Sequence, residues 1–432
     1  KNRYFALNLS SISKPPSKYV VFKVFTLFLI VVVFTQNELP LLSRIKAMKL
    51  RALSMAVLMA ALPLSTLAAG LDRSGQSIAA FLQPGNYAEA GLSVLDPSVR
   101  GVGLDQRPVS DMADDYYFPT AAVKVQVSDH MSLGLLYDQP YGGDATYAAD
   151  SFMFGNGVEG TTVEVRTNNL TALMGYQPNE NWNVYAGPVW QTVEADIQLR
   201  GAAYGGVGKL GTYRIKVDQE PAFGWVAGLA YQIPEIALKA AITYRSEIQH
   251  KATAKETTAL PVPSLTALTS GVEATTPQSV NLDFQTGIAA DTLAFANVRW
   301  VHWSQFAVKP NLLGNISQLG APYVRQNLID YAEDQWSANV GVGRKFNAKW
   351  SGTATLGYDS GAGNPITTLG PTEGYWNVGL GAQYSPAEHY FIQGGVKYFW
   401  LGDATAQTGQ TRVGEFSDNH ALGYGMKIGY RF

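Results

Sequence analysis

The chain has 432 residues, with 32 Lys and Arg against 34 Asp and Glu and a formal net charge of -2. Charged residues make up only 15%, against about 25% in an ordinary soluble domain, while 43 Gly, 23 Tyr and 9 Trp indicate many turns and interfacial aromatic side chains. The absence of cysteine excludes disulfide scaffolds, Cys-ligated metal sites and thiol catalysis. The chain also lacks the basic excess that nucleic-acid binding needs, so no nucleic acid is expected as a partner.

Two apolar stretches come first. Residues 19–35 form an apolar run interrupted by Lys23. Residues 48–69 begin with a short basic region, continue with an apolar core and end in Ala68-Ala69, which is typical of a secretory signal peptide cleaved near that point. Residues 1–47 are then either a second membrane anchor or, as we favour, a segment translated upstream of the true start and absent from the mature protein.

A short segment follows the signal peptide. Ile78, Phe81 and Leu82 have the spacing of a short helix, which Pro84-Gly85 would end, since proline lacks a donor and glycine permits turn dihedrals.

From residue 88 to Phe432 apolar and polar residues alternate with period two, which predicts strands. Clear examples are residues 223–232, 238–245, 279–288, 390–399 and 424–432. Six short turns, near 128–131, 177–182, 232–235, 289–292, 347–349 and 385–389, alternate with seven longer loops, near 99–118, 138–160, 200–212, 250–276, 304–333, 359–372 and 401–418. Short turns at one end and an even strand count are typical of outer-membrane barrels. We therefore predict an all-β fold, a transmembrane antiparallel β-barrel of about 14 strands over residues 88–432, in the outer membrane of a Gram-negative bacterium.

Aromatic residues at strand ends support this membrane placement, because their rings are stable at the headgroup level. The outward faces carry Trp182, Trp225, Tyr231, Tyr244, Trp300, Trp336, Phe346, Trp350, Tyr358, Trp376 and Tyr384. The terminal Phe432, with Tyr430 and Ile428 on the same face, resembles the C-terminal signal read by the barrel assembly machinery. Expected partners are therefore that machinery, outer-membrane lipid and lipopolysaccharide, with the chain as a monomer.

Enzyme motifs are not found. The five histidines lack metal-site spacing, residues 357–361 do not form a nucleophile elbow, and Gly208-Lys209 is not a phosphate-binding loop. We expect no enzyme activity, no catalytic residue, no metal and no cofactor.

Three short stretches carry a resemblance to a known family. They are Trp303-Ser304-Gln305-Phe306 after Asn297-Val298-Arg299-Trp300, the stretch from Tyr137 to Gly142, and the stretch from Thr276 to Ser279. With the strand count and loop placement over residues 70–432, the sequence resembles the FadL-type long-chain fatty acid and hydrocarbon outer-membrane transporter family.

The resemblance implies a barrel closed by an N-terminal hatch, here residues 70–87. It also implies passive uptake of hydrophobic compounds, above all long-chain fatty acids, by an apolar groove and a lumenal pocket, with lateral release at the third strand. The Asn-Pro-Ala motif common in the family's hatch is absent here.

Candidate ligand-binding residues fall into three groups. The apolar hatch residues are Leu71, Ile78, Phe81 and Leu82. The loop 259–272 is too apolar for an ordinary exposed loop and supplies Leu260, Val262, Leu265 and Leu268. Together with Leu312, Leu313, Ile316 and Leu319 it would form an apolar lip; the alternative is that these residues pack only to order the loops. A substrate carboxylate would need a cation, for which the candidates are Arg200, Arg245 and Arg299.

Two other functions remain open. A general diffusion porin is one, although porins have about 16–18 strands and no hatch is expected in them. Uptake of neutral aromatic or alkane hydrocarbons is the other.

Overall fold

The computed structural model describes residues 70–319 and 324–432. The predictions for residues 1–69, including the signal peptide, lie outside the described residues. The described chain forms one antiparallel wall that closes on itself, because β1 (Tyr87–Ser98) pairs with both β4 (Tyr116–Gln126) and β24 (His420–Arg431). The closed wall has fourteen strand positions, which confirms the predicted barrel.

Three of the fourteen positions are split into two strands. The third consists of β5 (Met131–Asp138) and β6 (Gly142–Thr146), the seventh of β10 (Leu238–Arg245) and β11 (Ile248–Thr257), and the eighth of β12 (Ala267–Thr276) and β13 (Ser279–Ala289). The remaining positions are β7 (Thr162–Tyr176), β8 (Trp182–Gln198), β9 (Arg214–Ile233), β14 (Thr292–Val301), β17 (Gln335–Lys345), β18 (Trp350–Asp359), β20 (Tyr375–Ala387) and β21 (Tyr390–Leu401). Each break gives the chain a place where it can depart from the regular wall.

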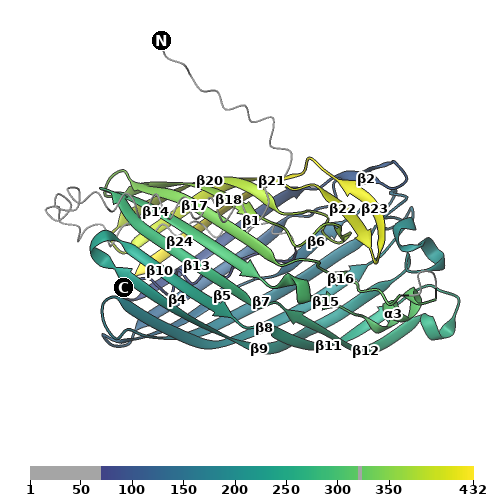
Figure 1. Ribbon diagram of the computed structural model, residues 1–432, viewed down its shortest axis with the longest axis horizontal. Coiled ribbons are helices and arrows are strands. Elements are labelled where there is room, and N and C mark those ends of the chain that lie inside the picture. The colour runs from purple at the N-terminus through teal and green to yellow at the C-terminus, as the bar shows by residue number, and fades with distance from the viewer. Residues whose placement is uncertain (1–69, 320–323) are drawn as a thin grey trace, which may run out of the picture. The chain divides into compact units, whose positions relative to one another are not determined.

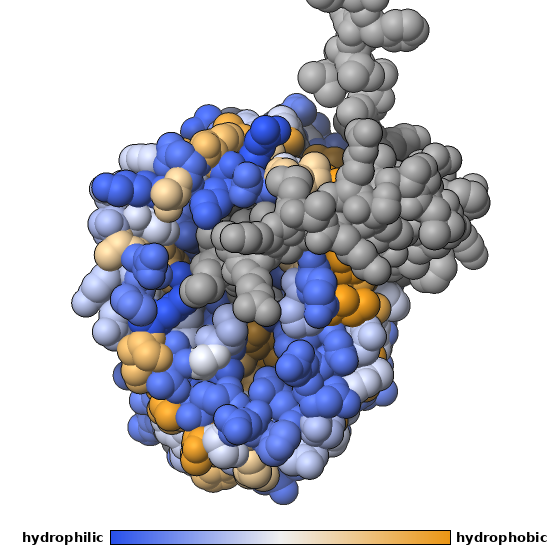
Figure 2. Space-filling model, turned by 90° about the vertical axis from the view of Figure 1, so that its left-hand side faces the viewer, coloured by the Kyte–Doolittle hydropathy of each residue, from blue (hydrophilic) through white to orange (hydrophobic). Residues whose placement is uncertain are grey.

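The two ends of the barrel differ as the loop lengths predict. The short turns and Phe432 lie at one end, at the left of Figure 1, and the long connections lie at the other. Hydrophilic residues make up most of the coloured surface at the short-turn end (Figure 2). Aromatic pairs mark two levels of the outer surface, Trp182–Tyr231 near the short turns and Trp225–Tyr244 further up. Such belts are expected where a barrel wall meets the two membrane interfaces.

The long connections build a cap at the other end. Five short strands form a small sheet, namely β2 (Gly101–Gly103), β3 (Pro108–Val109), β19 (Ile366–Thr367), β22 (Ala404–Thr408) and β23 (Thr411–Phe416). A second pair, β15 (Ala307–Val308) and β16 (Ile329–Asp330), flanks the helix α3 (Asn311–Ser317). Among the described residues no helix has the length and apolar character to cross a membrane.

Two local predictions are wrong. Residues 71–82 form turns rather than a helix. Phe81 and Leu82 bond to the Ile78 carbonyl within the segment, while other backbone groups bond to the wall, as Arg73 does to Pro140. The loop near 250–276 is mostly a hairpin of β11 and β12, which extends the wall beyond the upper aromatic level. Its inner face carries small or apolar residues, Ala252, Ala254, Val272 and Ala274, between the polar His250 and Glu256.

Candidate functional site

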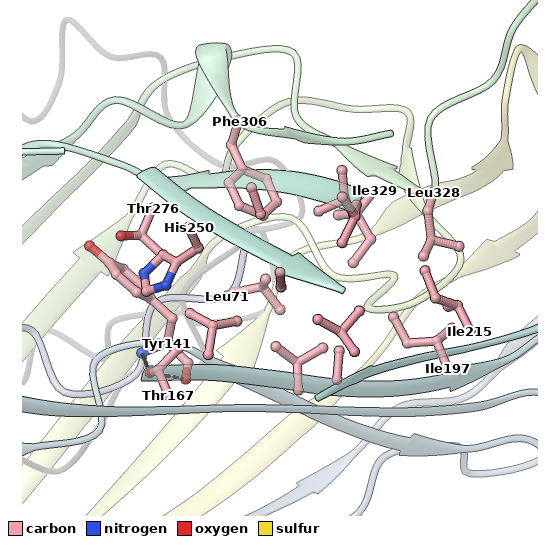
Figure 3. A pocket seen from close by; sticks show the side chains of 18 of the residues that line it. Leu71, Tyr141, Thr167, Ile197, Ile215, His250, Thr276, Phe306, Leu328 and Ile329 are labelled. Carbon is pink, nitrogen blue, oxygen red and sulfur yellow. Dashed lines mark hydrogen bonds between the residues drawn. The ribbon is translucent and has the colours of Figure 1, made fainter. Parts of the chain in front are cut away.

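An apolar cavity lies in the upper half of the barrel, between the hatch, the wall and the loop after β14. About 790 Å³ of space lies between its lining atoms, part of it open to the outside. Figure 3 shows Leu71 and Phe306 extending into the same space as Ile197, Ile215 and Ile329. The described residues that line it include no Lys, Arg, Asp or Glu.

Polar side chains lie only at the lower end of this cavity. His250 on β11 and Thr276 on β12 both bond to Gln191 Oε1 on β8, at 3.0 and 2.7 Å. Tyr141, between β5 and β6, exchanges hydrogen bonds with Thr167. This arrangement satisfies most polar atoms locally and leaves apolar surface above for a ligand.

The motif Trp303-Ser304-Gln305-Phe306 forms the roof of the cavity. Trp303 is fully buried and donates from Nε1 to Gln335 Oε1 at 2.7 Å. Ser304 donates through both its N–H and its hydroxyl to Asp334. Burial alone would raise the pKa of Asp334, but the hydrogen bonds from Ser304 and Trp300 bring it below its usual value. The motif therefore holds Trp303 and Phe306 over the cavity by anchoring the turn between them.

Below the cavity the hatch crosses the lumen and binds two buried arginines. Arg299 Nε lies 2.7 Å from Asp72 Oδ2, with side chains only 3% and 2% exposed. Arg299 also donates to Gln76 Oε1, and Arg245 donates to the Gln76 carbonyl. Gln76 holds a left-handed backbone at φ 49° next to Gly75 at φ 61°, an unfavourable conformation for a residue other than glycine. This turn aims both Gln76 groups at the two arginines.

The lower part of the hatch is apolar and equally enclosed. Ile78, Phe81 and Leu82 are buried in a cluster with wall residues that include Tyr185, whose ring meets Phe81 edge-on at 5.7 Å. At its end, Lys239 donates to the Leu82 carbonyl at 2.5 Å, and Lys124 donates to the Gln83 carbonyl at 2.7 Å. The segment thus fills the lumen between the cavity and the short-turn end.

The hatch is joined to the break in the third strand. Asp72 and Tyr141 form an isolated antiparallel bridge, and Ser74 donates its hydroxyl to Asp138. On the other side of the break β4 pairs with β5 only from Ala121 onward. Further up, the Tyr116 hydroxyl bonds to the backbone of Asp144 in β6 in place of a continuous ladder. Hatch, cavity and wall break therefore meet around Tyr141.

The predicted ligand residues are distributed over these regions. Leu71 lines the cavity. The loop leucines Leu260, Leu265 and Leu268 pack on the upper core, as do Leu312, Leu313 and Ile316 of α3, whereas Val262 and Leu319 are exposed. Arg200 bonds to Glu159 and to two backbone carbonyls among the outer loops. The structure does not bring the three arginines together, and a substrate role for any of them stays a prediction.

Sequence reasoning missed much of the cavity. Val193, Ala195, Val217 and Ala252 come from three wall strands and carry no motif. Alternation within each strand predicts which of its residues point inward, but it does not predict which strands meet around the cavity. Asp72 and Gln76 were also missed, because their partners lie more than 160 residues away along the chain.

A closed antiparallel barrel with aromatic belts and an apolar cavity in its lumen defines an outer-membrane β-barrel. The family described as "Outer membrane protein transport protein (OMPP1/FadL/TodX)" matches residues 71–432, and the chain belongs to it. The protein is accordingly placed in the outer membrane of a Gram-negative cell, in a family of transport proteins rather than enzymes.

Solved structures share the fold at low sequence identity. A Pseudomonas aeruginosa FadL homologue is 15% identical with a TM-score of 0.66, covering 82% of this chain and 92% of that one. The Pseudomonas putida toluene transporter TodX is 14% identical with a TM-score of 0.58, covering 82% and 91%. The Ralstonia pickettii toluene transporter TbuX is 14% identical with a TM-score of 0.55, covering 84% and 95%. No curated protein sequence matches the chain.

Proposed function

We propose that the protein is a channel for the passive uptake of hydrophobic compounds across the outer membrane. The observation that carries the proposal is the apolar cavity held above a hatch that fills the lumen. Each buried CH2 group gains about 0.8 kcal/mol on leaving water, so an apolar solute is drawn into such a cavity without an energy source. Release would follow laterally, near the break between β5 and β6, because Tyr141 belongs both to the cavity lining and to that break.

The hatch also argues against a general diffusion porin. Sugars need a continuous water-filled path, and the buried network of Asp72, Arg299 and Gln76 occupies the position of that path. Liposome swelling with the purified protein tests the distinction. We expect swelling rates in sugars close to those of protein-free liposomes, whereas rapid sugar influx would defeat the proposal.

For the cargo itself we propose long-chain fatty acids first, with the alkyl chain in the cavity. Neutral aromatic or alkane hydrocarbons are the second candidate, and one observation favours them. No cationic side chain is among the described residues that line the cavity, and the two arginines below it are bonded to the hatch.

Comparing oleate with methyl oleate separates the two cargo types, since the chains are the same and only the charge differs. If a cation binds the carboxylate, oleate should bind more tightly by about 1–3 kcal/mol. If the apolar cavity alone provides the binding energy, the two affinities should agree and toluene should displace both. Equilibrium binding is measured on the purified barrel by tryptophan fluorescence. The Trp303→Phe variant identifies the part of the fluorescence change that comes from Trp303.

A further inference from the structure

The hydrogen-bonded wall is interrupted at a second place, between β9 and β11. β9 pairs with β10 as far as Val226 and Arg245, and pairs again with β11 from Val217 and Ala254. Between these points the described strands form no ladder, apart from two bonds between Trp225 and Ser246 at the lower end. We call the two facing stretches, residues 218–224 and 247–253, the β9–β11 window.

A mismatch of side-chain phase explains the interruption. In β10 the inward residues have odd numbers, and after Ser246 and Glu247 the inward residues of β11 have even numbers. β9 makes the same change at a different height, near Asp218. Facing residues of a ladder must point to the same side of the sheet. Because the two strands change phase at different heights, their facing side chains point to opposite sides in the stretch between those heights. Pro221 removes one donor as well.

Two cavities lie directly behind the window. Val217, His250 and Ala252 belong to the lining of the main cavity. Ser246 and Ile248 border a second, much smaller cavity that reaches Gln76 and Arg245 below. The buried side chains of Ile248 and His250 close the window. A Cβ atom on Gly224 would lie 2.6 Å from Cγ1 of Ile248, which shows how closely Ile248 fills the gap.

The outer surface changes character at this level. Phe223, at the lower end of the window, and Trp225, just below it, are 73% and 52% exposed. Beside the window the outer face is polar, with Lys251 paired to Glu273 at 3.7 Å and Gln249 bonded to the same carboxylate. The window therefore opens where the apolar belt ends, at the level where amphipathic and apolar solutes collect at a membrane interface.

We propose that the β9–β11 window is a lateral passage between the outer interface and the main cavity, with Ile248 and His250 as its gate. Opening it requires movement of two side chains and breaks the hydrogen bond between His250 and Gln191, but no ladder hydrogen bond is lost, in contrast to any intact part of the wall. The proposal rests on the proposed function only for the hydrophobic nature of the cargo. The passage is separate from the break between β5 and β6, which lies on other strands.

The test uses the absence of native cysteine. Ala252→Cys places one thiol in the cavity, and the rate of its labelling by N-phenylmaleimide is measured in proteoliposomes. Ile248→Ala should raise that rate about threefold or more by leaving a void in the gate, and Ile248→Trp should lower it by a similar factor. Thr253→Cys, on the outer face, is the matched control and should react at one rate in all three backgrounds. Leu173→Ala, a truncation in the same buried cluster away from the window, should have no effect on the cavity thiol.

Heat-modifiable migration on gels verifies that each variant is folded; if Ile248→Trp fails to fold, Ile248→Ala alone decides. An unchanged labelling rate of the cavity thiol in the folded Ile248 variants overturns the window. If neither the wild-type barrel nor its variants take up a hydrophobic compound, the proposed function is overturned. The labelling rates still decide whether the window is a passage.

Discussion

At the scale of single residues, burial decides which ion pairs matter. Asp72 and Arg299 are almost completely removed from solvent, whereas Lys251 and Glu273 are 69% and 62% exposed on the outer face. Breaking a buried pair by removing one charge typically costs about 3–5 kcal/mol, because the other charge stays buried and uncompensated. An exposed pair contributes about 0–1 kcal/mol.

Asp72→Asn should therefore loosen the hatch while the wall stays intact. We expect faster protease cleavage near residue 72 and measurable ion conductance in planar bilayers, with unchanged heat-modifiable migration. Lys251→Gln is the control and should behave as the wild type. A closed, protease-resistant Asp72→Asn barrel would show that the pair does not hold the hatch.

Phe81 is the corresponding apolar anchor. It is fully buried, and the wall glycines Gly134 and Gly175 leave room for its ring, since a Cβ atom on either would collide with it. Phe81→Ala should cost the hatch about 3–5 kcal/mol of packing and admit small sugars in a swelling assay. Val262→Ala, at an exposed loop position, should not. Equal swelling for both variants would contradict a hatch role for Phe81.

At the scale of elements, the helix α3 depends on one wall residue. The buried Glu256 of β11 accepts hydrogen bonds at 3.0 Å from the first three N–H groups of α3, at Asn311, Leu312 and Leu313. The Tyr213 hydroxyl bonds to the same carboxylate at 2.9 Å. A negative charge at this end also complements the helix dipole.

Glu256→Gln should weaken this cap by about 1–3 kcal/mol, since charge-assisted bonds are lost and a buried acceptor is left incomplete. Hydrogen exchange of residues 311–317 should accelerate about tenfold or more, while exchange in β7 and β8 stays slow. Glu273→Gln, on the outer face, is the matched control. Unchanged exchange in α3 would remove Glu256 as its anchor.

The elements also show what a sequence can and cannot predict. Alternation along each strand and the order of short and long connections were sufficient for the barrel, because period two is a local signal. The hatch conformation had no such signal. Its turns are stabilised by Arg245, Arg299, Lys124 and Lys239 of distant strands. Arg245 and Arg299 were singled out from the sequence as candidate cations, but their hatch partners could not be read from spacing.

At the scale of the whole molecule, the upper and lower halves of the lumen serve different purposes. The lower half is filled by the hatch and its polar and apolar contacts. The upper half keeps an apolar cavity, bordered by two interruptions of the wall. On the proposed function, a molecule built in this way excludes water-soluble compounds and leaves lateral routes for apolar ones. This division of the lumen is the central claim of the account.

The uptake by intact Gram-negative cells of the labelled cargo that the binding comparison identifies, oleate or toluene, tests this claim most directly. Ala252→Trp fills the cavity from its lining, and Thr253→Trp, the next residue, places the same side chain on the outer face. We expect cells with the wild-type chain or Thr253→Trp to exceed the empty-vector rate several-fold, and cells with folded Ala252→Trp to fall towards it. Equal uptake with Ala252→Trp and Thr253→Trp, or a wild-type rate no higher than the vector rate, would contradict the account.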